Sequence, residues 1–507
     1  MENVINLVKN LQTGEIKLLR HFYRFQKDND CKKINLLFDI AVKSKNCKKT
    51  DEIDKKVFHE LYGNSKHGNT FVKLKSRLKN DILNILLLQT SSIKFKAKHD
   101  IAIFDCRRML LQGDILLGRG IYSEGIAILE KASSIAQKNE LFAEQILIDE
   151  LCRNHNLLKS EEYVFSAFMK RIETNTSLLE KVQFAKHFHY EMTASRLFKI
   201  KSSTQNVEWK NKLEAVKKDY EQSKSVKIGF YYNLSALNYY REIHQFDKSL
   251  EFGLALLKNA ESHEILKTPY YSGKINMELA KCYLLSTEYE KAITHANIAN
   301  QHFQKDILNE LASLEILLHC YLLKQDYKKV NSIIDTAFLK IRLESDEFIY
   351  SKWCFLKAGV EFRMNEYKNA LLSLKKCNEL LKDKNGWLLA CNLFESICRI
   401  ESGNLEWFEY RSEALKKIML RYNKDQVGEQ NKRFDLIYKI LRTLHKNNYD
   451  YVQTLSDEKN NLSFLSQAGY SYSWHMIGYE PIQFDQWIKD KATSQLKNKK
   501  GKSKLVA

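Results

Sequence analysis

The chain has 507 residues, of which 44% are hydrophobic and 28% are charged. Its 2 prolines and 17 glycines fall far below the roughly 5% and 7% of ordinary usage. Strand-rich and α/β folds use these residues in their turns, whereas long helices joined by short polar turns need few of them. The composition therefore predicts an all-α protein and excludes collagen-like, disulfide-scaffold and low-complexity classes.

Positive charge is concentrated at the two ends of the chain. The whole chain has 81 Lys and Arg against 62 Asp and Glu, a net charge of +19. Residues 1–100 hold 21 basic and 11 acidic side chains, residues 485–507 hold 7 and 2, and residues 101–484 hold 53 and 49. A basic excess favours nucleic acids and other polyanions, although solvated lysine-rich helix faces give the same count. The balanced middle is not expected to bind polyanions.

Residues 1–100 are expected to form a small basic helical module. Helical spacing of apolar residues predicts helices at 3–12, 15–26, 34–44, 51–62 and 70–89. A helix, a Gly-containing turn and a basic helix is the arrangement of DNA-binding helix-turn-helix and winged-helix modules. The nucleic-acid contacts would come from the basic residues of the last helix, Lys73, Lys75, Arg77 and Lys79. Because the turn before it is longer than the usual three or four residues, a capping or dimerising bundle is the preferred interpretation.

An internal repeat begins near residue 101. An aromatic residue followed three positions later by a small or apolar residue recurs in the segments YSEGI, FDKSL, YEKAI, YKKVN and YKNAL, which begin at Tyr122, Phe246, Tyr289, Tyr327 and Tyr367. Small or apolar residues lie nine or ten positions before and ten positions after each anchor. Two antiparallel helices approach closely only where their contact residues are small, and an aromatic residue near the turn fills the wedge between them.

This pattern resembles the tetratricopeptide repeat (TPR). The best copy lies at 275–299, where the residues in family register are Ala280, Tyr283, Tyr289, Ala292 and Ala299. The first-helix tryptophan and the closing proline of the family are absent. Successive anchors from Phe246 are 43, 38 and 40 residues apart rather than 34. The resemblance implies that residues 101–447 form a right-handed superhelix, or solenoid, of helix pairs.

The last sixty residues have a different composition. Residues 448–507 contain an aromatic stretch that is expected to cap the final apolar face of the array through Tyr470, Tyr472, Trp474 and Trp487. The basic tail that follows is expected to be disordered.

The sequence offers little for catalysis. His59 and His263 begin HE pairs, but Gly63 and Lys267 stand where a zinc-protease helix needs its second histidine. No phosphate-binding or nucleophile-elbow motif occurs, so we expect no enzyme activity, no metal and no cofactor. Ten scattered cysteines, the lack of a signal-peptide pattern and the lack of a long apolar run predict a reduced, cytoplasmic protein without a membrane segment.

The remaining candidate site is a concave groove. In the resembled family the first helix of each pair lines this surface, so the matching positions imply a mixed apolar and basic groove. Its members are Tyr231, Asn238, Arg241, Lys274, Met277, Lys281, His319, Lys352, Phe355 and Arg363.

Two functions follow as hypotheses. The first is a non-enzymatic scaffold that binds a protein or peptide partner in the groove. The alternative is a transcriptional or signalling regulator whose N-terminal module binds nucleic acid and whose array senses a peptide or dimerises.

Overall fold

The computed structural model describes residues 4–5, 7–8, 11–25, 29–43, 50–63, 68–88, 97–156, 162–198, 205–304, 306–344, 346–382, 386–425, 429–466, 474 and 478–505. Of these residues 88% are helical and none lies in a strand, so the predicted all-α class is confirmed. The chain divides into two compact units, residues 1–96 and 97–507. Each is described by itself.

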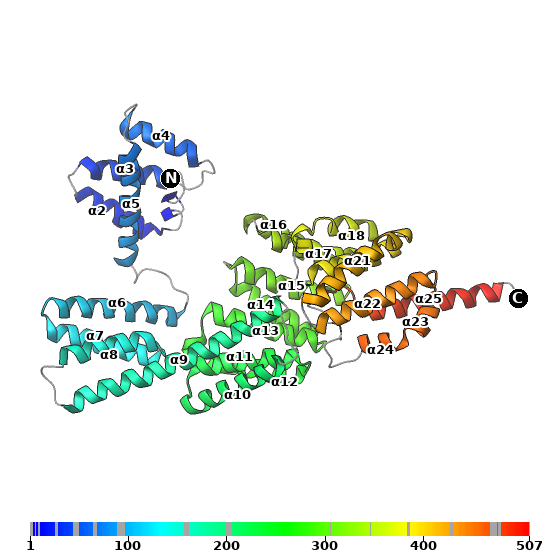
Figure 1. Ribbon diagram of the computed structural model, residues 1–507. Helices are drawn as coiled ribbons and strands as arrows, with labels where there is room; N and C mark the ends of the chain where they lie inside the picture. The colour runs from blue at the N-terminus through cyan, green and yellow to red at the C-terminus, as the bar shows by residue number, and fades with distance from the viewer. Residues whose placement is uncertain are drawn as a thin grey trace. The chain divides into compact units, whose positions relative to one another are not determined.

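The first unit is a helical bundle (Figure 1). Its described helices are α2 Thr13–Phe25, α3 Asn29–Lys43, α4 Thr50–Tyr62 and α5 Gly68–Leu88. Helix α5 packs against α2 and α3 and buries the side chains whose spacing predicted it, Leu74, Leu78, Ile82 and Ile85. The phenolic hydroxyl of Tyr23 donates to Asp81 over 2.9 Å. The unit therefore has its own hydrophobic core.

The second unit consists of helices that pack mainly against their neighbours in sequence. Its first half comprises α6 Lys98–Gly118, α7 Tyr122–Lys138, α8 Phe142–Asn156, α9 Glu162–Phe198, α10 Gln205–Ser223, α11 Val226–Glu242, α12 Phe246–Ser262, the short 3₁₀ helix Glu264–Leu266, α13 Pro269–Leu285 and α14 Tyr289–His302. Its second half comprises α15 Ile307–Leu323, α16 Tyr327–Glu344, α17 Glu347–Arg363, α18 Tyr367–Leu374, α19 Asn378–Lys382, α20 Trp387–Glu401, α21 Glu406–Asp425, α22 Glu429–Lys446, α23 Tyr451–Asp457, α24 Lys459–Ser466 and α25 Phe484–Leu505.

Five hairpins of this unit share one turn. Each aromatic anchor is the first residue of the second helix, and the residue two positions earlier has a positive φ of 59° to 77°. These left-handed residues are Gly120, His244, Thr287, Gln325 and Asn365. The turn after α13 is representative, because Glu288 N–H donates to the carbonyl of Tyr283 over 2.9 Å and Thr287 N–H donates to that of Leu284 over 3.2 Å. This pair of bonds is the Schellman motif, which satisfies the last carbonyls of a helix.

Small residues set how closely the paired helices approach. In the hairpin of α13 and α14, Ala280, Ala292, Ala296 and Ala299 are fully buried. In the hairpin of α6 and α7, a Cβ atom at Gly113 would lie 2.5 Å from Leu129 Cγ. Larger side chains at these positions would force the paired helices apart.

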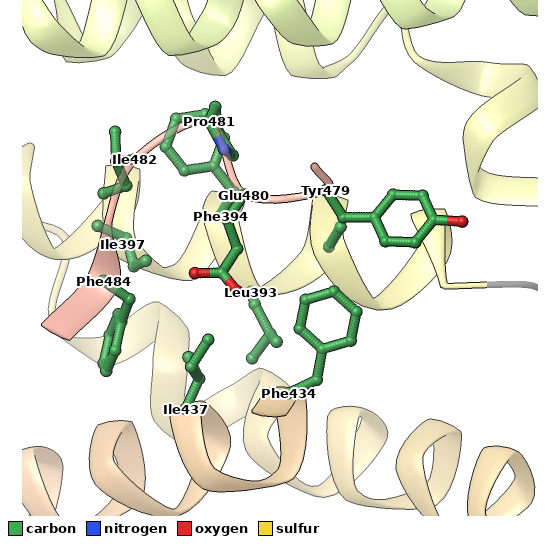
Figure 2. A pocket seen from close by; sticks show the side chains of 11 residues that line it. Leu393, Phe394, Ile397, Phe434, Ile437, Tyr479, Glu480, Pro481, Ile482 and Phe484 are labelled. Atoms are coloured by element: carbon green, nitrogen blue, oxygen red, sulfur yellow. The ribbon is translucent and has the colours of Figure 1, made fainter. Parts of the chain in front are cut away.

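The segment before α25 returns to the hairpins around α17 and α20. A Cβ atom at Gly359 of α17 would lie 2.6 Å from Pro481 Cβ. The ring of Tyr479 packs edge-on against Trp387, with centroids 4.4 Å apart. Figure 2 shows residues 479–482 crossing beside α20, and Phe394 and Ile397 of α20 line the same pocket as Phe434 and Ile437 of α22. Long-range packing thus closes this end of the unit.

The C-terminal cap expected from the sequence is partly within the described residues. Trp487 is 8% exposed, and Trp474 Nε1 donates to the carbonyl of Glu480 over 3.2 Å. Tyr470 and Tyr472 lie outside the described residues. The basic tail differs from the disorder expected, because α25 continues to Leu505. Each residue added to an anchored helix gains a hydrogen bond, and no proline interrupts this segment.

Among the described helices, none combines the length and apolar character that crossing a bilayer requires.

Replacing Thr287 with glycine is expected to stabilise the protein by about 1 kcal/mol. A β-branched residue at φ 61° bears the left-handed penalty of about 1–2 kcal/mol, part of which is offset by the greater freedom of glycine in the unfolded chain. Chemical denaturation measures the change. The control is Ser286→Gly at φ −84°, which should be neutral or destabilising. A loss of stability in Thr287→Gly would contradict this account of the turn.

Candidate functional site

A buried ion pair connects the first helices of two neighbouring hairpins. Arg241 of α11 contacts Glu278 of α13 over 2.7 Å, and both side chains are at most 3% exposed. Arg241 also donates to the side-chain oxygen of Asn238. Since an unpaired charge at such depth would cost several kcal/mol, each member of this pair requires the other.

Glu278 also binds two lysines at the surface. Lys281 Nζ lies 2.8 Å from Glu278 Oε1, and Lys274 Nζ lies 3.5 Å from the same atom. Both lysine side chains are 18% exposed. One buried carboxylate therefore orients three cations.

The next carboxylate, Glu315 of α15, repeats this arrangement. Lys352 of α17 contacts Glu315 over 2.7 Å. Burial alone would raise the pKa of Glu315, but Lys352, His319 and Lys281 outweigh burial and hold this pKa below its usual value. The influence of Lys281 links Glu315 to the cluster around Glu278. These residues form a charged row.

The charged row is defined by seven charged side chains and one histidine: Arg241, Lys274, Glu278, Lys281, Glu315, His319, Lys352 and Arg363. Its five Lys and Arg residues outnumber its two carboxylates. His319 is uncharged at neutral pH and adds nothing to this excess.

His319 lies between the cations of the row. Burial lowers its pKa to about 4, and Arg363 and Lys352 contribute in the same direction, while Glu315 on the same helix opposes them. Its Nε2 atom is buried without a hydrogen-bond partner. The ring is therefore neutral at pH 7 and fills the buried space near Lys352 and Arg363 without adding charge.

The remaining groove candidates have apolar surroundings. Tyr231 packs against Phe230 with ring centroids 5.2 Å apart, and burial raises its pKa. Met277 is 3% and Phe355 is 1% exposed, and the Phe355 ring lies 5.6 Å from that of Trp387. The structure thus differs from the expected mixed groove, because α20 and the neighbouring hairpins cover the apolar members.

Sequence reasoning missed Glu278, and it did not select Glu315 as a site residue although Glu315 stands at a groove-facing position of the resembled family. A signal was present in the spacing, because the Arg241–Glu278 and Glu315–Lys352 pairs each join residues 37 positions apart. Glu278 and Glu315 are themselves separated by the same interval. Opposite charges recurring at a constant spacing, close to the 38 to 43 residues between anchors, indicate pairing between successive first helices.

The four basic residues of α5 lie on two flanks of the helix. Lys73, Arg77 and Lys79 are exposed, while Lys75 Nζ lies 4.5 Å from the centroid of the Phe71 ring. With 3.6 residues per turn, Lys73 lies near Arg77 and Lys75 near Lys79, and the two pairs are separated by about 160° around the axis. If one flank of α5 faced a DNA groove, only one of these two pairs would contact the DNA.

The remaining histidine, cysteine and acidic side chains that the structure describes form neither a metal site nor a reactive thiol site. Within the described ranges, no group of three or more His, Cys, Asp or Glu side chains is arranged to hold a metal. Eight cysteines, at positions 106, 152, 282, 320, 354, 377, 391 and 398, are buried free thiols, and burial raises the pKa of Cys106 and Cys152 to about 11. Such thiols are poor nucleophiles.

Comparison of the sequence with models of known protein families gives no match, and comparison with curated proteins finds no similar sequence. The charged row is therefore interpreted from its own geometry.

Lowering the pH from about 6.5 to about 4 is expected to destabilise the protein through His319. In the unfolded chain this histidine binds a proton near pH 6.5, whereas in the fold it does so near pH 4. The unfolded state therefore binds more protons across that window, and the free energy of unfolding falls as pH falls, by up to about 3 kcal/mol.

Urea denaturation at several pH values measures this slope. His319→Gln should flatten it, whereas His263→Gln, at an exposed position, should leave it unchanged. Equal slopes in all three proteins would show that His319 is not held neutral.

Proposed function

We propose that this chain is a non-enzymatic helical-repeat protein of the TPR type, and that it binds an acidic segment of a partner protein along the charged row. The observation that carries the proposal is the excess of five cations over two buried carboxylates, connected across α11, α13, α15 and α17. In the proposed superhelix the first helices lie side by side on the inner surface. A cytoplasmic location stays a prediction.

The buried carboxylates support binding by fixing the lysines in place. Glu278 holds Lys274 and Lys281, and Glu315 holds Lys352, while 18% to 30% of each lysine side chain stays exposed. A partner then loses less entropy on binding, because these long side chains are already ordered. With Met277 and Phe355 in the core, recognition would depend on charge more than on apolar contact.

Replacing Lys274, Lys281 and Lys352 together with glutamine is expected to weaken binding of an acidic peptide at least about tenfold. Fluorescence anisotropy with a labelled Glu-rich peptide at low salt measures the affinity. Arg241 still compensates Glu278 in the variant, whereas Glu315 loses its contact with Lys352. The melting temperature should therefore fall by several degrees, and circular dichroism should show that the variant stays folded at the temperature of the binding assay.

The matched control replaces three exposed lysines on second helices, Lys258, Lys328 and Lys368. It removes the same net charge and should bind almost as the natural protein does. If both triple variants lose affinity equally, the effect is non-specific and the charged row is not the site.

A second function is supported by the N-terminal unit. Residues 1–96 have their own core, and α5 presents Lys73, Arg77 and Lys79 to solvent. A compact unit with a basic helix suits a regulator that binds nucleic acid and uses the array as a sensor or dimerisation domain.

In the full chain, replacing Lys73, Lys75, Arg77 and Lys79 with glutamine is expected to reduce the salt dependence of binding to duplex DNA. The slope of log K against log salt should fall by about 2, because one flank of α5 supplies two phosphate contacts. The control replaces four exposed lysines of the same unit, Lys17, Lys32, Lys55 and Lys56. An unchanged slope in the α5 variant, or equal changes in both, would contradict DNA binding by α5.

A further inference from the structure

A pocket lies where several first helices end and α25 passes. Its volume is about 490 Å³, within the range of small-molecule sites. The C-terminal ends of α15, α17 and α20, the starts of α16 and α18, and α25 contribute to it. The polar and aromatic residues of its lining include Tyr327, Arg363, Tyr367, Glu401, Trp487 and Lys491.

The carboxylate of the lining, Glu401, is fully engaged. Trp487 Nε1 donates to one of its oxygens over 2.7 Å, and Lys491 Nζ lies 2.5 Å from the other. The hydroxyl of Tyr367 donates to the side-chain oxygen of Asn365, another lining residue, over 2.8 Å. The charges of Glu401 and Lys491 therefore neutralise each other, and the two side chains form one side of the pocket.

Arg363 is the remaining charge in the lining. One of its terminal nitrogens lies 3.4 Å from the carbonyl oxygen of Pro481, and its Nε is buried without a hydrogen-bond partner. Within the described part of the chain no carboxylate pairs with it in a salt bridge. A guanidinium has five N–H donors and does not deprotonate in proteins, so most of its hydrogen-bonding capacity is unused.

We propose that this pocket binds a small organic acid whose carboxylate pairs with Arg363 and whose apolar body lies against the aromatic walls. The planar guanidinium fork matches the two oxygens of a carboxylate. Tyr327, Phe362, Tyr367 and Trp487 supply apolar and aromatic surface for the remainder of the ligand. The carboxylate of the ligand supplies the negative charge that Arg363 lacks in its surroundings.

This inference goes beyond the proposed function. The pocket shares Arg363 with the charged row, but Lys274, Lys281 and Lys352 do not line it. Binding of an acidic peptide and binding of a small acid are therefore separate measurements, and either one can fail while the other succeeds.

The test compares two probes that differ only in the charged group, N-acetyl-L-phenylalanine and its amide. Isothermal titration calorimetry with the full chain at pH 7 should detect the acid, and the amide should bind at least about tenfold more weakly. In Arg363→Met, the affinity for the acid should fall to the affinity that the natural protein has for the amide. The control, Arg342→Met at an exposed position of α16, should bind the acid normally.

A second variant leaves the cation intact. Leu323→Trp adds an indole to the pocket wall and should exclude the acid by filling space, which keeps the proposal testable if Arg363→Met fails to fold. Circular dichroism establishes the folding of each variant.

Three outcomes would overturn the proposal. They are equal binding of acid and amide, no binding of the acid up to about 10 mM, and unchanged binding in a folded Arg363→Met protein. A hexapeptide ending in phenylalanine carries the same carboxylate on a chain. Binding of that peptide without binding of the free acid would assign the pocket to chain ends and would also overturn it.

Discussion

The repeated left-handed turn is the constraint on which the hairpins depend. Between α13 and α14 the chain reverses in Ser286, Thr287 and Glu288, and the positive φ of Thr287 brings the start of the second helix back beside the end of the first. The aromatic anchor then fills the wedge, and small residues such as Ala280 and Ala292 allow close contact. Because the same turn recurs, equivalent first helices bring their charged residues together.

Features encoded locally were predictable from the sequence, whereas partners far apart in the chain were not. The anchors Tyr289 and Tyr327 and the scarcity of proline indicated helix pairs, because turn chemistry and periodicity depend on neighbouring residues. The burial of Met277 and Phe355 depends on which helices cover them, and the family positions carry no information on that cover. The pairing of Arg241 with Glu278 could not be predicted either, because it depends on how two separate helices pack.

The charged row shows how a helical protein keeps cations ordered at its surface. Each carboxylate is buried and contacts at least one lysine that is partly exposed, so the cost of its burial is compensated by positive charge. Glu278 is satisfied by Arg241 below and by Lys281 above. The surface side remains positive, which links the energetics of packing between α11 and α13 to the proposed binding of an acidic partner.

The return of residues 479–482 to α17 and α20 bears on how the protein is synthesised. Most contacts of the second unit join residues close in sequence, but Arg363 and Pro481 are 118 residues apart, and such closures are the slow ones in folding. Trp387 leaves the ribosome about a hundred residues before Trp487, a delay of roughly 5 to 20 s at ordinary rates of elongation. During that interval the surfaces of Phe394 and Phe434 lack their cover, and the nascent chain is exposed to aggregation and to chaperones at this point.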